Sequence, residues 1–214
     1  MDKRFFAVIA VIVAVFVGVA VVTNHKKDDT AKNDTTSASQ GTSHSKGSND
    51  AKVTLIEYGD YQCPACEQYY PIINQVLDAY GDKVKFEFRN YPLTNMHPNA
   101  YAAARAAEAA SLQNKFWEMH DMLYDSINWQ TWTVANNPQT NFNSYAQTLG
   151  LDVAKFQSDF SSSKVNDLIR ADMAKGDAIK ITATPTFVLN GKKLDSVGAS
   201  VDAFKAIIDP ELKK

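Results

Sequence analysis

The 214-residue sequence lacks the features of several broad protein classes. It has only two cysteines, so a zinc site would lack the second cysteine pair that such sites often use. Its formal net charge is only −2, which implies no basic surface for nucleic acid. No internal repeat or heptad pattern is visible. We therefore expect a monomer with no metal, no cofactor and no nucleic-acid partner.

Only one long apolar run is present, from Phe5 to Val22, and Lys3 and Arg4 precede it. The apolar region of a cleaved signal peptide usually has about 7–15 residues and ends at a small-residue cleavage site. A membrane-spanning helix needs about 17–25 residues. We therefore favour an uncleaved signal anchor over residues 1–22, with secretion after signal cleavage as the alternative. Both alternatives export the residues that follow.

Residues 23–50 have no aromatic residue and almost no large apolar one. Such a segment cannot offset the entropy lost on ordering, so we expect a disordered tether. As a random coil it would span about 30 Å. His25 and His44 lie in it without a nearby second ligand, and we interpret both as solvated residues. The folded domain is then expected over residues 51–214.

The two cysteines form a Cys-x-x-Cys motif, Cys63–Cys66. An apolar run over residues 53–58 predicts a buried strand just before it, and helical spacing predicts a helix from Cys63 to about Tyr80. Cys63 then lies at the helix N-cap, where free N–H groups and the positive dipole end favour a thiolate. Pro64, at the first helical position, costs no hydrogen bond. A strand leading into such a helix start is typical of thioredoxin-fold redox sites.

Strand patterns recur later in the chain, at residues 84–89 and 183–189. Asn190-Gly191 predicts a two-residue hairpin turn into a return strand over 192–197. A block of predicted helices lies between the second and third strands, at about residues 95–180, and includes a polar connection over 129–141. The predicted helices after the cysteine helix cover residues 98–113, 115–125, 142–149, 152–160, 165–176 and 201–208. The pattern predicts an α/β protein with a thioredoxin-like fold that carries a helical insertion.

Four groups of residues, in this order and spacing, resemble the DsbA-like thiol–disulfide oxidoreductases of the thioredoxin superfamily, in their membrane-tethered form. They are Glu57–Cys66, Arg89–Leu93 with His97–Ala100, Lys115–Asp121, and Thr184–Phe187 with Asn190–Lys192. The similarity covers roughly Ala51 to the C-terminus. The resemblance implies a thioredoxin fold whose helical insertion precedes the strand that starts at a cis-proline.

Because Cys63 comes first in its helix, we expect it to be the more exposed of the two cysteines and the attacking sulfur. The helix dipole contributes about 0.3–2 kcal/mol, which lowers a thiol pKa by at most roughly one and a half units. Further lowering needs hydrogen bonds from the N–H groups of Ala65 and Cys66 and from the Cys66 thiol. Cys66 should lie deeper, with a higher pKa, as the resolving thiol. A purely structural disulfide is the alternative. A disulfide that closes so short a loop adds little to the stability of the fold.

The resemblance implies roles for three further residues. Pro185 matches a cis-proline that faces the cysteines, and the backbone of Thr184 would pair with an extended substrate peptide. An ordinary trans-proline at a strand start is the alternative. Glu57 matches a buried acid that would relay the proton of Cys66, with a pKa raised by desolvation. The alternative for Glu57 is a strand residue that faces solvent. His97 and His120 are expected to be capping or core residues.

Strongly oxidising members of this family often carry a histidine between the cysteines, whereas this chain has Pro-Ala. That difference, with the nearby acids Asp60 and Glu67, predicts a less extreme pKa for Cys63. The reaction type that the resemblance implies is unaffected.

The resemblance implies an extracytoplasmic, membrane-anchored oxidoreductase that exchanges its Cys63–Cys66 disulfide with thiols of exported cysteine-containing proteins. We favour an oxidase, which would need a membrane partner to reoxidise it. A reductase or isomerase would use the same chemistry. A non-catalytic binding module is a further alternative, although such a module needs neither the two cysteines nor Pro185.

Overall fold

The computed structural model describes residues 41–214. The predicted anchor over residues 1–22 and the first part of the predicted tether lie outside the described residues. Within residues 41–214, no helix is both long and apolar enough to cross a membrane.

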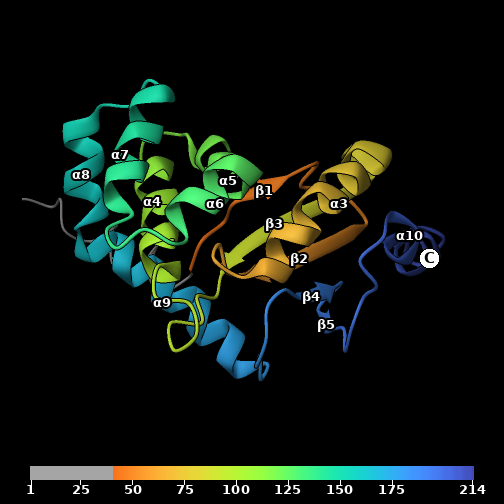
Figure 1. Ribbon diagram of the computed structural model, residues 1–214. Helices are drawn as coiled ribbons and strands as arrows, with labels where there is room; N and C mark the ends of the chain where they lie inside the picture. Colours follow the sequence, from red (N-terminus) through yellow and green to blue (C-terminus); the bar gives the residue numbers. More distant parts are fainter. Residues whose placement is uncertain (1–40) are drawn as a thin grey trace, which may run out of the picture. The chain divides into compact units, whose positions relative to one another are not determined.

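A five-stranded mixed sheet forms the centre of the described fold (Figure 1). Strands β2 and β3 are parallel, and β2 also pairs antiparallel with β4. The two outer strands pair antiparallel, β1 with β3 and β5 with β4, which gives the order β1-β3-β2-β4-β5. The strand bounds are β1 Ser45–Lys46, β2 Val53–Gly59, β3 Val84–Asn90, β4 Thr186–Leu189 and β5 Lys192–Lys193. The predictions for β2, β3 and β4 are confirmed to within a few residues.

Alternation along β2 decides which of its side chains face the core. Val53 and Leu55 are fully buried, and Glu57 shares their face because strand side chains repeat every two residues. In register, Glu57 lies beside Phe88 of β3 and Phe187 of β4. The one carboxyl in this strand therefore points to the apolar interior.

The predicted tether boundary at residue 50 is wrong, because residues 42–46 belong to the folded domain. Thr42 donates from its backbone N–H and its hydroxyl to the buried carboxylate of Asp172, at 2.9 and 2.5 Å. The His44 ring stacks on Phe116 at 3.4 Å between centroids and lies 2.9 Å from both carboxylate oxygens of Glu108. Polar composition predicted disorder here, but buried carboxylates from distant helices bind these polar groups. The interpretation of His44 as solvated is also wrong.

Helices α3 (Pro64–Tyr80) and α10 (Val201–Leu212) contact each other and the sheet. Pro71 lies inside α3, which continues past it to Tyr80. Ser200 caps α10 by accepting from the N–H of Ala203. The predicted terminal helix stopped at residue 208, whereas α10 runs on through Pro210. The predicted return strand over 192–197 was too long, since β5 has only two residues.

The helical insertion contains six helices, α4 to α9, between β3 and β4 (Figure 1). Small alanines that are almost completely buried let α4 pack closely against α5, α8 and α9. The predicted polar connection over 129–141 is wrong, because α6 occupies its first part and α7 begins at Gln139. Asp125 caps α6, and Trp132 is fully buried. The insertion bounds are α4 Ala100–Ser111, α5 Phe116–Tyr124, α6 Ser126–Trp132, α7 Gln139–Thr148, α8 Val153–Phe160 and α9 Ser163–Ala178.

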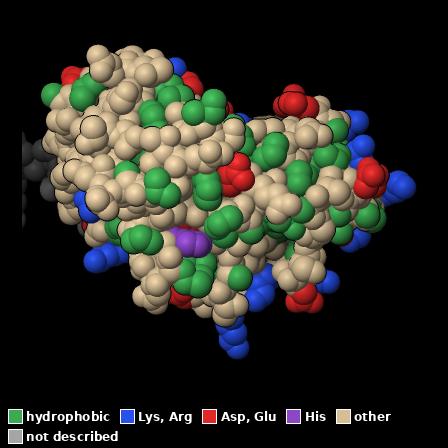
Figure 2. Space-filling model, viewed as in Figure 1, with side chains coloured by type: hydrophobic (Ala, Val, Ile, Leu, Met, Phe, Trp, Pro, Cys, Tyr) green, Lys and Arg blue, Asp and Glu red, His purple; other side chains and the backbone are tan. Residues whose placement is uncertain are grey.

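Charged side chains are mixed in sign on the described surface. On the face drawn in Figure 2, basic and acidic side chains are scattered and do not gather by sign. This face therefore shows no patch of a single charge sign.

Candidate active site

The two cysteines occupy the start of α3, as their spacing predicts. Cys63 is the N-cap residue, with extended backbone, and Pro64 is the first helical residue. Both thiols are free, and they are 7% and 1% exposed for Cys63 and Cys66 respectively. Both cysteines are buried, and Cys63 is the more exposed of the two, as predicted.

The pKa of Cys63 is lowered from 9.0 to about 5. The largest cause is the hydrogen bond from the Cys66 thiol; burial opposes it, and the Thr184 side chain and the N–H groups of Cys66 and Ala65 add to it. The predicted hydrogen bonds from the Cys66 thiol and from the N–H groups of Ala65 and Cys66 are confirmed. Cys63 is therefore a thiolate at neutral pH.

The environment of Cys66 shifts its pKa in the opposite direction. Burial raises its pKa well above the usual range, and the hydrogen bond to Cys63 and the charge of Glu57 raise it further. The backbone N–H of Asp60 lies 3.5 Å from the Cys66 sulfur and lowers the pKa of Cys66. Cys66 therefore holds its proton at neutral pH, so any step that needs its thiolate must also move a proton.

Glu57 lies in the interior beside this pair and is 5% exposed. Burial, with a smaller effect from the charge of Cys63, raises its pKa from 4.5 to about 8. The prediction that Glu57 is buried with a raised pKa is confirmed, and the solvent-facing alternative is wrong. A carboxyl with a pKa near neutrality can both give and take a proton under physiological conditions.

The Thr184–Pro185 peptide bond is cis, as the resemblance implies. The Thr184 backbone carbonyl lies 3.3 Å from the Cys63 sulfur and accepts a hydrogen bond from it when Cys63 is protonated. The structure therefore brings together Cys63, Cys66, Glu57, Thr184 and Pro185, the five residues predicted as a site.

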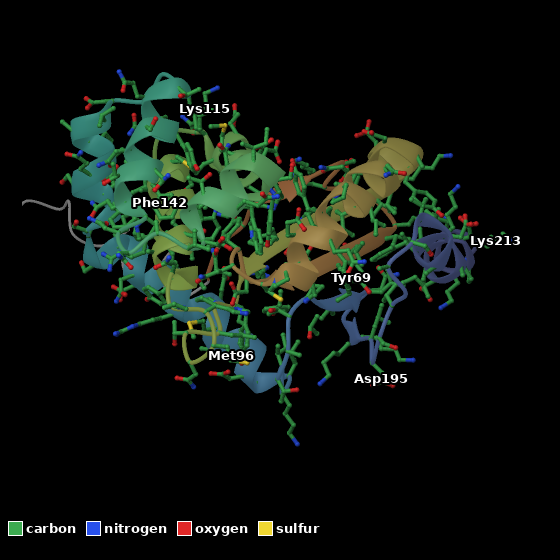
Figure 3. The ribbon with its side chains drawn as sticks, viewed as in Figure 1. Tyr69, Met96, Lys115, Phe142, Asp195 and Lys213 are labelled. Atoms are coloured by element: carbon green, nitrogen blue, oxygen red, sulfur yellow. The ribbon has the colours of Figure 1, made fainter. Side chains whose placement is uncertain are left out.

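A groove of about 220 Å³ begins at Pro185. Apolar side chains line much of it, and Tyr69 of α3 and Asp195 from the segment after β5 lie on its two sides (Figure 3). The apolar and aromatic lining residues are Ala65, Tyr69, Pro185, Phe187, Leu194 and Val197. The arrangement can hold an apolar or extended chain next to the Cys63 sulfur.

The loop that leads into the cysteines is fixed by the helical insertion, which sequence reasoning missed. The buried Asp60 carboxylate accepts from the N–H of Leu93 and faces Nδ1 of His97, both at 2.8 Å. The Tyr61 carbonyl accepts from the indole of Trp129 at 2.8 Å.

Gln62 completes this attachment. Its amide accepts from the N–H of Asn99 at 2.6 Å and donates to the carbonyl of Thr133 at 2.8 Å. Three consecutive polar positions directly before a Cys-x-x-Cys motif were the available signal. The partners of these positions lie more than 30 residues away, so the local sequence does not identify them.

No cluster of histidine, cysteine and acidic residues suited to a metal ion occurs within residues 41–214. Two histidines near the site, His97 and His120, belong to no such cluster. His97 contacts Asp60 as described, and His120 is buried in α5, as expected for a core residue.

Comparisons with known proteins agree with this geometry. Residues 39–210 match the family described as thioredoxin. A curated relative, the Na(+)/H(+) antiporter NhaA 1 of Mycolicibacterium gilvum, is 38% identical over 149 residues, or 67% of this chain. The match spans only 22% of that protein, so the chain covers about a fifth of the length of such relatives. The antiport in its name belongs to that whole protein.

Two solved structures have the same fold. BdbD of Bacillus subtilis superposes with a TM-score of 0.65 at 25% identity, covering 79% of this chain and 92% of BdbD. The α-DsbA1 protein of Wolbachia pipientis gives a TM-score of 0.68 at 22% identity, with 79% and 90% covered. With the paired cysteines and the cis-proline, these matches lead to one conclusion: the chain belongs to the thioredoxin family and has the DsbA-like fold of thiol–disulfide oxidoreductases.

Proposed function

We propose that this thiol–disulfide oxidoreductase acts outside the cytoplasm as an oxidase that introduces disulfides into exported proteins. The observation that carries the proposal is the contrast within the cysteine pair. Cys63 has a pKa of about 5, while burial raises the pKa of Cys66 well above its usual range. One sulfur is suited to leave as a thiolate, and the other to hold a proton.

The reaction begins from the Cys63–Cys66 disulfide. A substrate thiolate attacks Cys63, the bond between the two enzyme sulfurs breaks, and Cys66 takes the electron pair and a proton. A second substrate thiolate then attacks the substrate sulfur of the mixed disulfide, and Cys63 leaves as a thiolate. The substrate gains a disulfide, and the enzyme becomes the dithiol.

The direction of exchange follows from the stability of that thiolate. Hydrogen bonds that lower the Cys63 pKa stabilise the reduced enzyme, so its disulfide is a better oxidant. Thioredoxin has a pKa of about 7 and a potential of about −270 mV, and DsbA has about 3.5 and about −120 mV. A pKa of about 5 lies between them. We therefore assign this enzyme a potential between those of the two proteins.

Glu57 is proposed as the proton relay for Cys66. The carboxyl gives its proton when Cys66 leaves as a thiolate, and takes it back when the dithiol is reoxidised. Its pKa of about 8 suits both directions near neutral pH. Without this carboxyl the buried Cys66 would have to exchange its proton with solvent unaided.

Thr184 and Pro185 are proposed to hold the substrate. The Thr184 backbone lies beside Cys63, so an extended peptide that pairs with it would place a cysteine against the reactive sulfur. The groove that starts at Pro185 would bind neighbouring apolar residues of the same peptide. Substrates would then be unfolded or flexible segments of exported proteins.

The location rests on the N-terminal sequence and on the chemistry. The apolar run Phe5–Val22 supports a signal anchor, and stable disulfides form mainly in oxidising compartments. An oxidase is left as a dithiol after each turnover, so a membrane partner that reoxidises it is part of the proposal.

Trapping tests the proposed function. Replacing Cys66 by Ser removes the resolving thiol, so mixed disulfides at Cys63 should persist. We expect the full-length Cys66→Ser chain, expressed in a bacterium, to carry exported proteins as mixed disulfides. Trapping of cytoplasmic proteins alone would contradict the location, and no trapping of any protein would contradict the activity. The matched Cys63→Ser chain is the control and should trap nothing.

A further inference from the structure

The side chain of Asp60, which precedes the two cysteines in the chain, is held by several donors. Its fully buried carboxylate accepts from the backbone N–H groups of Gln62 and Leu93, each at 2.8 Å. Nδ1 of His97 lies 2.8 Å from the same carboxylate. A carboxylate can only accept hydrogen bonds, so Nδ1 of His97 carries a proton and is the donor. Residues between β3 and α4 therefore fix the side chain of Asp60.

The backbone of Asp60 contacts both cysteines. Its carbonyl accepts from the N–H of Cys63 at 3.1 Å, and its own N–H lies 3.5 Å from the sulfur of Cys66. Burial, the neighbouring thiol and the charge of Glu57 all disfavour a negative charge on the Cys66 sulfur, whereas this N–H favours it. The backbone amide of Asp60 is therefore a hydrogen-bond donor to the buried sulfur of the pair.

The buried sulfur becomes negatively charged during thiol–disulfide exchange. When a thiolate attacks Cys63, a new disulfide bond forms at that sulfur, the Cys63–Cys66 bond breaks, and the electron pair moves to Cys66. Cys66 is 1% exposed, so bulk water does not solvate this charge. Donors that already point at a developing charge stabilise the transition state without reorganisation. The N–H of Asp60 has this position.

We propose that the Asp60 amide stabilises the negative charge that develops on Cys66, and that the contact between His97 and the Asp60 carboxylate aims this amide at the sulfur. Asp60 is a catalytic residue through its backbone, because its N–H touches a reacting atom. His97 is a positioning residue, because it acts through the Asp60 carboxylate. The inference rests on the proposed reaction, in which Cys66 leaves first and Glu57 supplies its proton.

Replacing His97 by Ala removes the contact and leaves the amide in the chain. The readout is the rate at which reduced glutathione opens the Cys63–Cys66 disulfide of the full-length enzyme at pH 7. We expect this rate to fall about 10-fold, which is less than the 10²–10³-fold cost of deleting such a donor, because the N–H is misaligned and not lost. Ring closure passes through the same transition state and should slow equally, so the reduction potential should not change.

Two further variants distinguish this role from general loosening of the fold. His97→Asn keeps an N–H near the place of Nδ1 and should restore most of the wild-type rate. His44→Ala removes another histidine that contacts a buried carboxylate, that of Glu108, and should leave the rate unchanged. Equal slowing in His97→Ala and His97→Asn, or in His97→Ala and His44→Ala, would overturn the proposal.

A double-mutant cycle with Cys66→Ser tests whether the effect acts through Cys66. In the Cys66→Ser chain, glutathione displaces Cys63 from its mixed disulfide with glutathione, and Cys66 takes no part. His97→Ala should not change this rate, which mass spectrometry of the released protein thiol measures. Slowing here as large as in the enzyme with both cysteines, or a wild-type rate in His97→Ala alone, would overturn the proposal. A wild-type disulfide that glutathione opens at Cys66 would instead contradict the proposed reaction.

Discussion

The two sides of the cysteine pair differ in almost every physical property. On the side of Cys63, hydrogen-bond donors, the Thr184 backbone and a nearby groove surround the less buried of the two cysteines. On the side of Cys66, apolar and aromatic groups enclose a thiol and the Glu57 carboxyl, and both pKa values are raised. The open side stabilises charge and the closed side excludes it. One disulfide can therefore receive a substrate at one sulfur while the other sulfur handles the proton.

The largest predicted effect comes from exchanging the two sulfurs for oxygen one at a time. Cys63→Ser should abolish oxidation of a dithiol peptide, because no sulfur remains on the open side. Cys66→Ser should also stop turnover but should still form a mixed disulfide with the peptide. Mass spectrometry of the purified proteins after incubation with an oxidised peptide distinguishes the two outcomes. If Cys66→Ser forms no adduct and Cys63→Ser does, the two sides are assigned the wrong way round.

Removing the carboxyl from the closed side should stabilise the protein at neutral pH. The folded state holds the Glu57 proton up to about pH 8, whereas the unfolded carboxyl loses it near 4.5. Between these values the unfolded state binds fewer protons, so stability falls as pH rises. Glu57→Gln removes that loss, and we expect a gain of about 2 kcal/mol at pH 7 after allowing for a buried amide.

Urea unfolding of the Glu57→Gln and wild-type dithiol enzymes measures this difference. Near pH 4 the variant should be slightly less stable than the wild type because of the buried amide, and the difference should shift in favour of the variant between pH 4.5 and 8. A gap that does not change with pH would show that Glu57 titrates normally.

A smaller effect is expected when the groove on the open side is changed. Leu194→Asp places a charge among the apolar lining residues, so apolar peptides should bind less tightly. We expect KM for an apolar dithiol peptide to rise about 10-fold, which corresponds to about 1.4 kcal/mol. The rate with glutathione, which is too small to fill the groove, should not change. An equal loss with both thiols would mean that the groove does not hold the peptide.

The smallest predicted effect on the redox chemistry concerns a segment distant from both sulfurs. His44→Ala removes the ring that stacks on Phe116 and contacts the buried Glu108, so the β1 segment should detach more easily. We expect a loss of about 1–3 kcal/mol in unfolding free energy, with the reduction potential unchanged. Hydrogen exchange at residues 44–46 provides the local readout, and unchanged protection there would contradict the role of His44.

The open side of the site could be predicted from the sequence because its signals are local. Cys63, Pro64 and the apolar spacing that follows define a helix start within a few residues, and the Asn190-Gly191 turn places the strand after Pro185. Glu57 was predicted to be buried from its place in an apolar strand together with the resemblance. In each case neighbouring residues carry most of the information.

The parts that were missed depend on distant partners. Residues 42–46 have the polar composition of a tether. Their polar groups nevertheless pair with Asp172 and Glu108, which lie 64 or more positions away in the sequence. The loop before Cys63 is held by His97, Asn99 and Trp129, which lie more than 30 positions further along the chain. Composition and periodicity describe a segment by itself. They do not show which buried groups elsewhere in the chain form hydrogen bonds with its polar atoms.

The reduction potential of the Cys63/Cys66 pair tests the central claim most directly. Equilibration of the enzyme with glutathione buffers at pH 7, followed by trapping of free thiols, gives the value. With a Cys63 pKa of about 5, the potential should lie above that of thioredoxin, about −270 mV, and below that of DsbA, about −120 mV. A value at or below about −270 mV would contradict the oxidase, because the dithiol form would then be a reductant.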